Sequence, residues 1–106
     1  MKLAAAALGG LLLAGGAMAA SPYDGLWAPR ADECKAVFLL LRPNGEFEHR
    51  LGDEPRKGRF SANAERITLR FEDGEDQIVP VMDRTESRLV LFDETVEGDR
   101  RLVRCP

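Results

Sequence analysis

The chain has 106 residues, of which 44% are hydrophobic and 31% charged, and its formal net charge is −3. This length allows one small domain. Acidic and basic residues are interspersed along the chain, which argues against a nucleic-acid-binding protein. We therefore expect no nucleic acid among its partners.

The first 20 residues have the composition of an export signal. Lys2 precedes an apolar core over 3–13, and small residues follow as far as Ala20. The apolar run is shorter than the roughly 20 residues of a membrane span and is broken by glycines. We predict a signal peptide over 1–20 and a single mature domain over 21–106, located in the periplasm or secreted, with no membrane insertion after cleavage.

Cys34 and Cys105, the two cysteines, are expected to form a structural disulfide. Exported proteins meet an oxidising compartment, and a small domain with a limited core gains from a covalent staple. A redox-active pair would usually be closer in sequence, as in C-x-x-C. The bridge would close a loop of about 70 residues, worth roughly 4 kcal/mol in the chain-entropy model.

After the signal, short apolar runs alternate with turn residues, which is typical of an antiparallel β protein. About eight strands are expected, over residues 25–28, 35–42, 46–50, 58–60, 66–71, 76–82, 88–93 and 99–105. Pro43–Gly45 is a hairpin turn, because Asn-Gly accepts positive φ angles. Pro80 indicates an edge or a bulge. At most one helical turn is expected, within 29–35.

Alternation within the strands predicts which side chains face the interior. Phe47 and His49, for example, share one face of their strand. The expected inward set is Trp27, Phe38, Leu40, Phe47, Phe60, Ile67, Leu69, Phe71, Val79, Val81, Leu89, Leu91 and Leu102. These side chains would fill a narrow eight-stranded barrel and leave at most a shallow pocket at its open end.

Sequential hairpins form either an open sandwich or a closed barrel. Closure pairs the first strand with the last and removes exposed edges. A bridge between Cys34 and Cys105 requires Cα atoms within about 7 Å, so the first and last strands must lie near each other. The predicted fold is an all-β, antiparallel up-and-down barrel of about eight strands, although a sandwich also can bring its ends together.

The motif Gly25-Leu26-Trp27 on the first strand resembles the G-x-W signature of lipocalin-like (calycin) barrels. The resemblance implies that the Trp plugs one end of the barrel and that an Arg of the last strand lies across its ring. Arg104 is the expected partner and Arg101 the alternative, in a contact worth about 0.5–2 kcal/mol. Gly25, Trp27 and Arg104 are therefore the predicted closure residues.

In size the chain is similar to the small bacterial inhibitors of secreted metalloproteases, which are also exported G-x-W barrels. Those inhibitors insert an N-terminal tail into the protease cleft, whereas the tail here spans only about Ser21–Asp24. Their disulfide joins early strands instead of the two ends of the chain. The resemblance implies inhibition as one possible function.

Groups able to do chemistry are sparse. His49, the only histidine, is interpreted as a partly buried or rim residue instead of a general base, and neither Ser61 nor Ser87 lies in a nucleophile elbow. One His and a bonded Cys pair leave no zinc site. The acidic turn 71–76 lacks EF-hand spacing and is interpreted as a solvated hairpin tip. No enzyme activity, cofactor or metal is expected.

The leading hypothesis is therefore a monomeric binding or inhibitor module that acts on an envelope or secreted protein. It would bind through the rim loops 51–57 and 94–100, with His49, Arg56 and Lys57 as possible contact residues. The alternative is a carrier of a small apolar ligand in the barrel mouth. A carrier requires an apolar cavity of about 300 Å³ or more.

Overall fold

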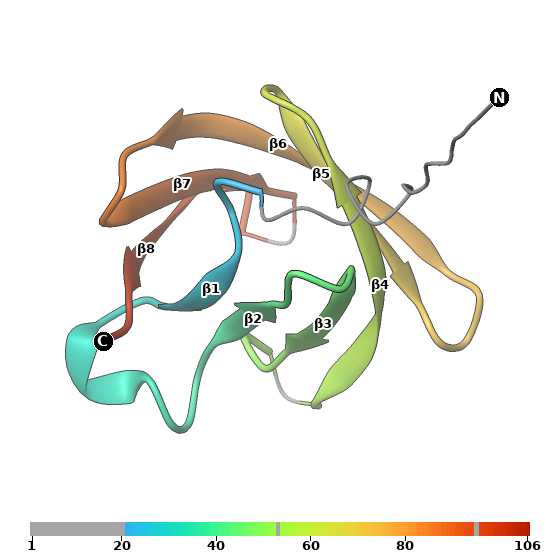
Figure 1. The fold of residues 1–106 in the computed structure, drawn as a ribbon, viewed down its shortest axis with the longest axis horizontal. Coiled ribbons are helices and arrows are strands. Elements are labelled where there is room, and N and C mark those ends of the chain that lie inside the picture. Colours follow the sequence, from blue (N-terminus) through green and yellow to red (C-terminus); the bar gives the residue numbers. More distant parts are fainter. Residues whose placement is uncertain (1–20, 53, 95) are drawn as a thin grey trace, which may run out of the picture.

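The computed structural model of the chain is a closed antiparallel barrel of eight strands, shown in Figure 1. It describes residues 21–52, 54–94 and 96–106, and the predicted signal peptide lies outside the described residues. Each strand pairs with its neighbours in the sequence, and the last strand pairs back onto the first. The predicted all-β, up-and-down barrel is therefore confirmed.

The strands are short, as the spacing of turn residues predicts. They are β1 (Gly25–Ala28), β2 (Leu39–Leu41), β3 (Glu46–His49), β4 (Arg56–Ala62), β5 (Arg66–Phe71), β6 (Asp76–Arg84), β7 (Arg88–Asp93) and β8 (Gly98–Arg104). One 3-10 turn, η2 (Ala31–Glu33), connects β1 to β2. Among the described residues, no helix has the length and apolar character to cross a membrane.

The second strand is shorter than the sequence predicts. Residues 35–42 are predicted as a strand, but the amides of Ala36 and Val37 both donate to the carbonyl of Glu33. These bonds hold the start of the segment in a turn. β2 is therefore only three residues long and begins at Leu39.

The inward face of β2 is also the opposite of the predicted one. Leu39 lies opposite Trp27 on β1, and residues opposite each other on paired strands share a face. Leu39 and Leu41 are accordingly buried. Phe38 and Leu40, which were predicted to face inward, are partly exposed instead.

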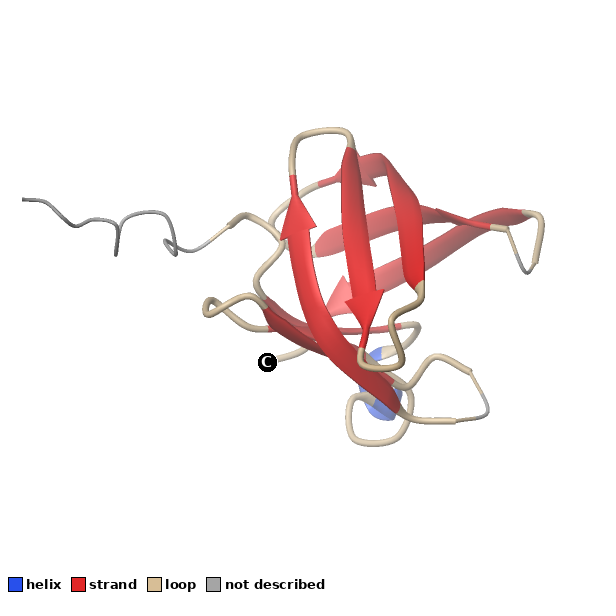
Figure 2. Ribbon diagram, turned by 90° about the vertical axis from the view of Figure 1, so that its right-hand side faces the viewer, coloured by secondary structure: helices blue, strands red, loops and turns tan. Residues whose placement is uncertain are grey.

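The strands curve around one apolar core, as Figure 2 shows from a second direction. All the predicted inward residues except Phe38 and Leu40 belong to this core or pack against it. Phe60 and Val81 are the two that are only partly buried. The buried members are Tyr23, Trp27, Leu39, Leu41, Phe47, Ile67, Leu69, Phe71, Val79, Leu89, Leu91 and Leu102. Tyr23, which precedes β1, is an addition that strand alternation does not predict.

Gly58 on β4 allows the strands around it to approach closely. It lies opposite Phe47 of β3 and Phe71 of β5, and the two rings meet edge to face with their centroids 5.3 Å apart. A Cβ at this position would overlap the backbone carbonyl of Arg70. The absence of a side chain therefore lets β4 and β5 approach each other closely at this position.

β6 contains the irregularity that Pro80 predicts. Its pairing with β7 shifts register between Val81 and Asp83, directly after the proline. Because Val81 donates its amide to Glu65 on the β5 side, the missing N–H of Pro80 would have pointed toward β7. The strand continues to Arg84, two residues beyond the predicted end.

One end of the barrel is closed around Trp27, which is fully buried. The indole Nε1 donates to the carbonyl of Tyr23 at 2.8 Å, and the guanidinium of Arg104 lies 4.3 Å from the centre of the indole ring. Gly25 has a φ of 138°, and a Cβ there would overlap the Arg104 guanidinium. Gly25, Trp27 and Arg104 thus meet at one point, whereas Arg101, the alternative, is exposed.

The predicted disulfide between Cys34 and Cys105 is confirmed, with a Cα–Cα distance of 6.0 Å. Cys105 follows β8, and its amide donates to the carbonyl of Leu26 on β1 at 2.7 Å. The bridge therefore joins the segment after β1 to the end of β8. Figure 1 shows the C-terminus beside the β1–β2 connection.

Candidate binding site at the open end of the barrel

The up-and-down topology divides the connections between the two ends of the barrel. The N-terminal segment and the β2–β3, β4–β5 and β6–β7 turns share the closed end, and the β3–β4, β5–β6 and β7–β8 connections share the open end. His49 is the last residue of β3 and Arg56 and Lys57 are the first of β4, so all three lie at the open end.

Arg56 and Lys57 lie in a strand and not, as predicted, in the rim loop 51–57. Arg56 pairs with His49, and Lys57 pairs with Glu48, because the β3–β4 ladder extends to the last residue of β3. The backbone of both residues is therefore fixed. Their side chains are presented from the edge of the barrel wall.

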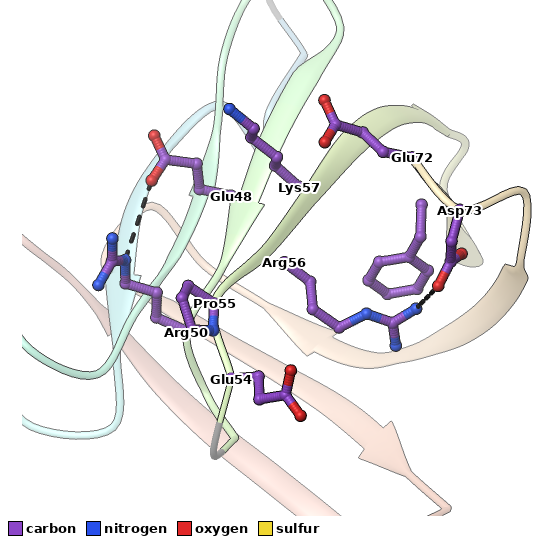
Figure 3. Close-up of a pocket in the computed structure, with 9 residues that line it drawn as sticks. Glu48, Arg50, Glu54, Pro55, Arg56, Lys57, Glu72 and Asp73 are labelled. Atoms are coloured by element: carbon purple, nitrogen blue, oxygen red, sulfur yellow. Dashed lines mark hydrogen bonds and ion pairs between the residues drawn. The ribbon is translucent and has the colours of Figure 1, made fainter.

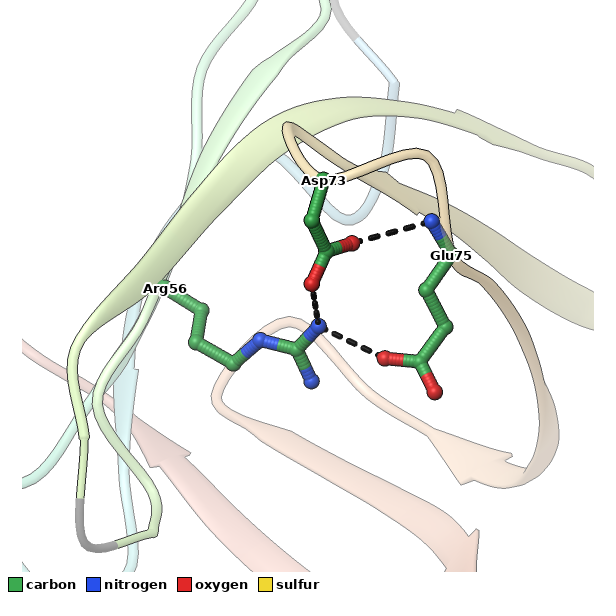
Figure 4. Close-up of polar contacts among 3 residues, drawn as sticks. All are labelled: Arg56, Asp73 and Glu75. Carbon is green, nitrogen blue, oxygen red and sulfur yellow. Dashed lines mark hydrogen bonds and ion pairs between the residues drawn. The ribbon is translucent and has the colours of Figure 1, made fainter.

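The guanidinium of Arg56 is held by three groups of the β5–β6 hairpin. It lies 3.7 Å from the centre of the Phe71 ring, and its Nη2 donates to Asp73 at 3.0 Å and to Glu75 at 2.6 Å. Figure 4 shows the guanidinium between the two carboxylates. The hydrogen bond with Glu75, more than any other contact, raises the pKa of Arg56 above its usual value. The contact covers the face of a core aromatic ring at the barrel mouth.

A cavity of about 570 Å³, which we call the mouth cavity, lies at the open end. Its charged lining consists of two arginines and four carboxylates, so it is acidic overall. The lining residues are His49, Leu51, Gly52, Glu54, Arg56, Phe71, Asp73, Glu75, Gln77, Asp93 and Arg100. Arg100 and Asp93 form a partly buried ion pair at 2.6 Å. This pair places polar groups between the cavity and the apolar core.

His49 points inward beside Phe71, with the ring centroids 6.2 Å apart. Its Nδ1 is buried and has no hydrogen-bond partner among the described residues. Burial, followed by the charge of Arg100, lowers the pKa of His49 below its ordinary value. The imidazole is therefore neutral at pH 7 and can offer the mouth cavity an uncharged polar group.

A second cavity of about 530 Å³, which we call the outer cavity, adjoins the first. The two share Glu54, Arg56, Phe71 and Asp73 as lining residues. Figure 3 shows the Arg56 side chain directed toward Asp73, while the side chain of Lys57, which also lines the outer cavity, extends away from them. Arg56 therefore contributes to the walls of both hollows at the open end.

The barrel interior beneath the mouth is filled. The cavity that reaches down to Leu39, Leu69 and Val79 has a volume of only about 30 Å³. That is room for about one water molecule, far below the roughly 300 Å³ that a ligand cavity needs. The site is thus a polar mouth above a packed core.

The other groups considered in the sequence are paired or lie elsewhere in the barrel. The described residues contain no group of three or more His, Cys, Asp or Glu side chains that fits a metal ion. In the acidic turn, Asp76 pairs with Arg70 at 2.9 Å, and the hydrogen bond from Arg70 lowers the pKa of this carboxyl. Ser87 lies in the β6–β7 turn at the closed end, remote from His49.

Comparison with protein-family models, with curated proteins and with solved structures gives no match for this chain.

Proposed function

We propose that this protein is an exported binding module that acts on another protein through the open end of its barrel. The polar mouth above a packed core is the observation that carries the proposal. A surface with two adjacent hollows and many charged side chains suits recognition of a polar protein surface. The alternative, a carrier of an apolar ligand, has weaker support, because the interior cavity of about 30 Å³ is too small for such a ligand.

The proposal includes export through the N-terminal segment and a lipocalin-like closure of the barrel. The disulfide supports export, because such bonds persist in oxidising compartments. The meeting of Gly25, Trp27 and Arg104 supports the lipocalin-like relationship, since these are the positions that the G-x-W resemblance implies. We propose no catalytic activity.

The proposed surface can be tested with two charge-exchange variants of equal net charge. The open-end variant combines Glu54→Arg with Lys57→Glu, and the control combines Glu65→Arg with Arg66→Glu at the closed end. All four side chains are exposed, so both variants should fold. Each variant, in oxidised form, is used as bait in an envelope fraction, alongside the unchanged protein.

We expect the unchanged protein and the closed-end control to capture a common partner. The open-end variant should capture at least tenfold less of it, because charge complementarity is lost over several contacts. Retention of the same partner by all three proteins would overturn the assignment of the open end. Loss caused by the closed-end control alone would place the binding surface at the other end.

A further inference from the structure

We propose that the Phe71 ring and the carboxylates of Asp73 and Glu75 form a receptor for a basic side chain of the partner, and that Arg56 occupies this receptor in the free protein. The inference rests on the proposed function and names the chemistry of the partner: an exposed lysine or arginine. Phe71, Asp73 and Glu75 are called the cation site below.

The first support is the way Arg56 is bound. An aromatic face and two carboxylates surround one guanidinium, with its central carbon 3.7 Å from the ring centre and its Nη2 shared between both acids. Aromatic rings bind cations through the negative charge on their faces, and carboxylates add charge-assisted hydrogen bonds. The receptor chemistry is therefore visible with a guanidinium already in place.

The second support is that the ion pairs that hold Arg56 are exposed. Its side chain is 36% exposed, and those of Asp73 and Glu75 are 63% and 62% exposed. Ion pairs with this exposure contribute little to stability because water and salt screen them. The backbone of Arg56 stays fixed by β4 while its long side chain moves into solvent.

The third support is the space around the cation site. The mouth cavity and the outer cavity, about 570 and 530 Å³, meet at Arg56 and share Phe71 and Asp73 in their walls. A partner's side chain can reach the Phe71 ring from either hollow once Arg56 moves aside. The ring itself is buried beneath Arg56, so displacement exposes an aromatic surface that the incoming cation covers again.

The fourth support is charge. Without the guanidinium of Arg56, the mouth cavity keeps the carboxylates of Glu54, Asp73, Glu75 and Asp93 against the single cation of Arg100. The neutral His49 adds no positive charge, since burial and Arg100 lower its pKa. The vacated mouth is therefore strongly acidic and attracts a cation in place of an anion or an apolar group.

The test uses N-acetyl-arginine amide as the probe, with the uncharged N-acetyl-citrulline amide as its control. The protein is expressed from the full chain and purified with its disulfide formed, and binding is followed by NMR at the amides of 71–77. Arg56→Gln removes the internal competitor. Arg70→Gln is the matched control. Arg70 carries the same charge as Arg56 and lies on β5, the strand that pairs with β4, but it lines neither cavity.

We expect Arg56→Gln to bind the arginine probe about fivefold more tightly than the unchanged protein, as loss of one exposed ion-pair and cation–π competitor implies. Arg70→Gln should bind like the unchanged protein, and citrulline should not bind. Adding Asp73→Asn and Glu75→Gln to Arg56→Gln should abolish binding of the arginine probe.

Equal binding of arginine and citrulline, or no gain from Arg56→Gln, would overturn the cation site. The proposed function would survive that result if the open-end charge-exchange variant still lost its partner. If Arg56→Gln binds the probe but the charge-exchange variant keeps its partner, the cation site stands as a small-molecule site and the assignment of protein binding to the open end falls. If Arg56→Gln does not fold, Arg56→Lys provides the comparison, with a smaller expected gain because its ammonium lacks the planar fork.

Discussion

The guanidinium of Arg104 and the indole of Trp27 are stacked 4.3 Å apart at the closed end of the barrel. The same guanidinium donates to the carbonyl of Asp24 at 2.7 Å and to that of Glu86 at 2.6 Å. One side chain of the last strand thus fastens the N-terminal segment, the plug residue and the β6–β7 turn. Closure at this end places the proposed binding surface at the opposite end.

Replacing this arginine should weaken the fold. Arg104→Ala removes the cation–π contact and leaves the carbonyls of Asp24, Glu86 and Pro22 without this donor, which should lower the free energy of unfolding by about 2 kcal/mol or more. Arg101→Ala, on the same strand but exposed, should change it by less than about 0.5 kcal/mol. Urea unfolding of both variants measures the difference. Equal changes in the free energy of unfolding for the two variants would mean that the contact of Arg104 with Trp27 contributes nothing to stability.

Gly25 should depend on the same arginine. At a φ of 138°, an alanine would be strained, and its Cβ would also overlap the Arg104 guanidinium. Gly25→Ala should therefore cost about 1–3 kcal/mol, and should cost less in an Arg104→Ala background. A double-mutant cycle of unfolding free energies measures this coupling. Strict additivity would show that the two positions act independently.

The disulfide should stabilise the barrel by joining its ends. Its 71-residue sequence separation means that breaking it frees most of the barrel chain in the unfolded state. The combined variant Cys34→Ser and Cys105→Ser should lose about 2–4 kcal/mol. Urea midpoints with and without reductant should differ for the unchanged protein and coincide for the variant. Two free thiols in protein recovered from the periplasm would contradict a structural role.

His49 should produce a defined dependence of stability on pH. Because burial and Arg100 lower its pKa in the fold, the unfolded chain binds a proton first on acidification. The contribution of His49 to the free energy of unfolding is therefore fully present above about pH 6.5, the pKa in the unfolded chain. It decreases as the pH falls toward the lower pKa of the folded protein. His49→Gln should remove this component.

The histidine can be titrated directly, since it is the only one in the chain. The imidazole proton signal in NMR should report a pKa below that of a model peptide. A value at or above about 6.5 would show that His49 is solvated or paired with Asp93 more strongly than with Arg100.

Strand order could be predicted because it depends on local turn signals, and barrel closure could be predicted because a Cys34–Cys105 bridge brings the two ends of the chain together. The 66–71 and 88–93 strands alternate or end at clear turns, and they appear with the predicted bounds. The face of β2 could not be predicted in the same way. Residues 37–41 are all apolar, so a period of two gives no preferred face, and only pairing with Trp27 on β1 fixes it.

The candidate site was less accessible to sequence reasoning. His49 and Arg56 could be placed at the rim, but the partners of Arg56 lie 17 and 19 residues away, on the next hairpin. The sequence has 18 acidic residues, and nothing local distinguishes Asp73 and Glu75 from the others. Only the pairing of β4 with β5 and of β5 with β6 brings Arg56 onto the Phe71 ring and beside these two carboxylates.

The central claim is that the open end is the surface that meets the partner, and photo-crosslinking in cells tests it most directly. A photoreactive phenylalanine analogue placed at Glu54, at the open end, or at Ala64, in the β4–β5 turn, occupies an exposed position in either case. The account predicts a covalent adduct with another protein from position 54 and none from position 64. Adducts from position 64 alone would contradict it.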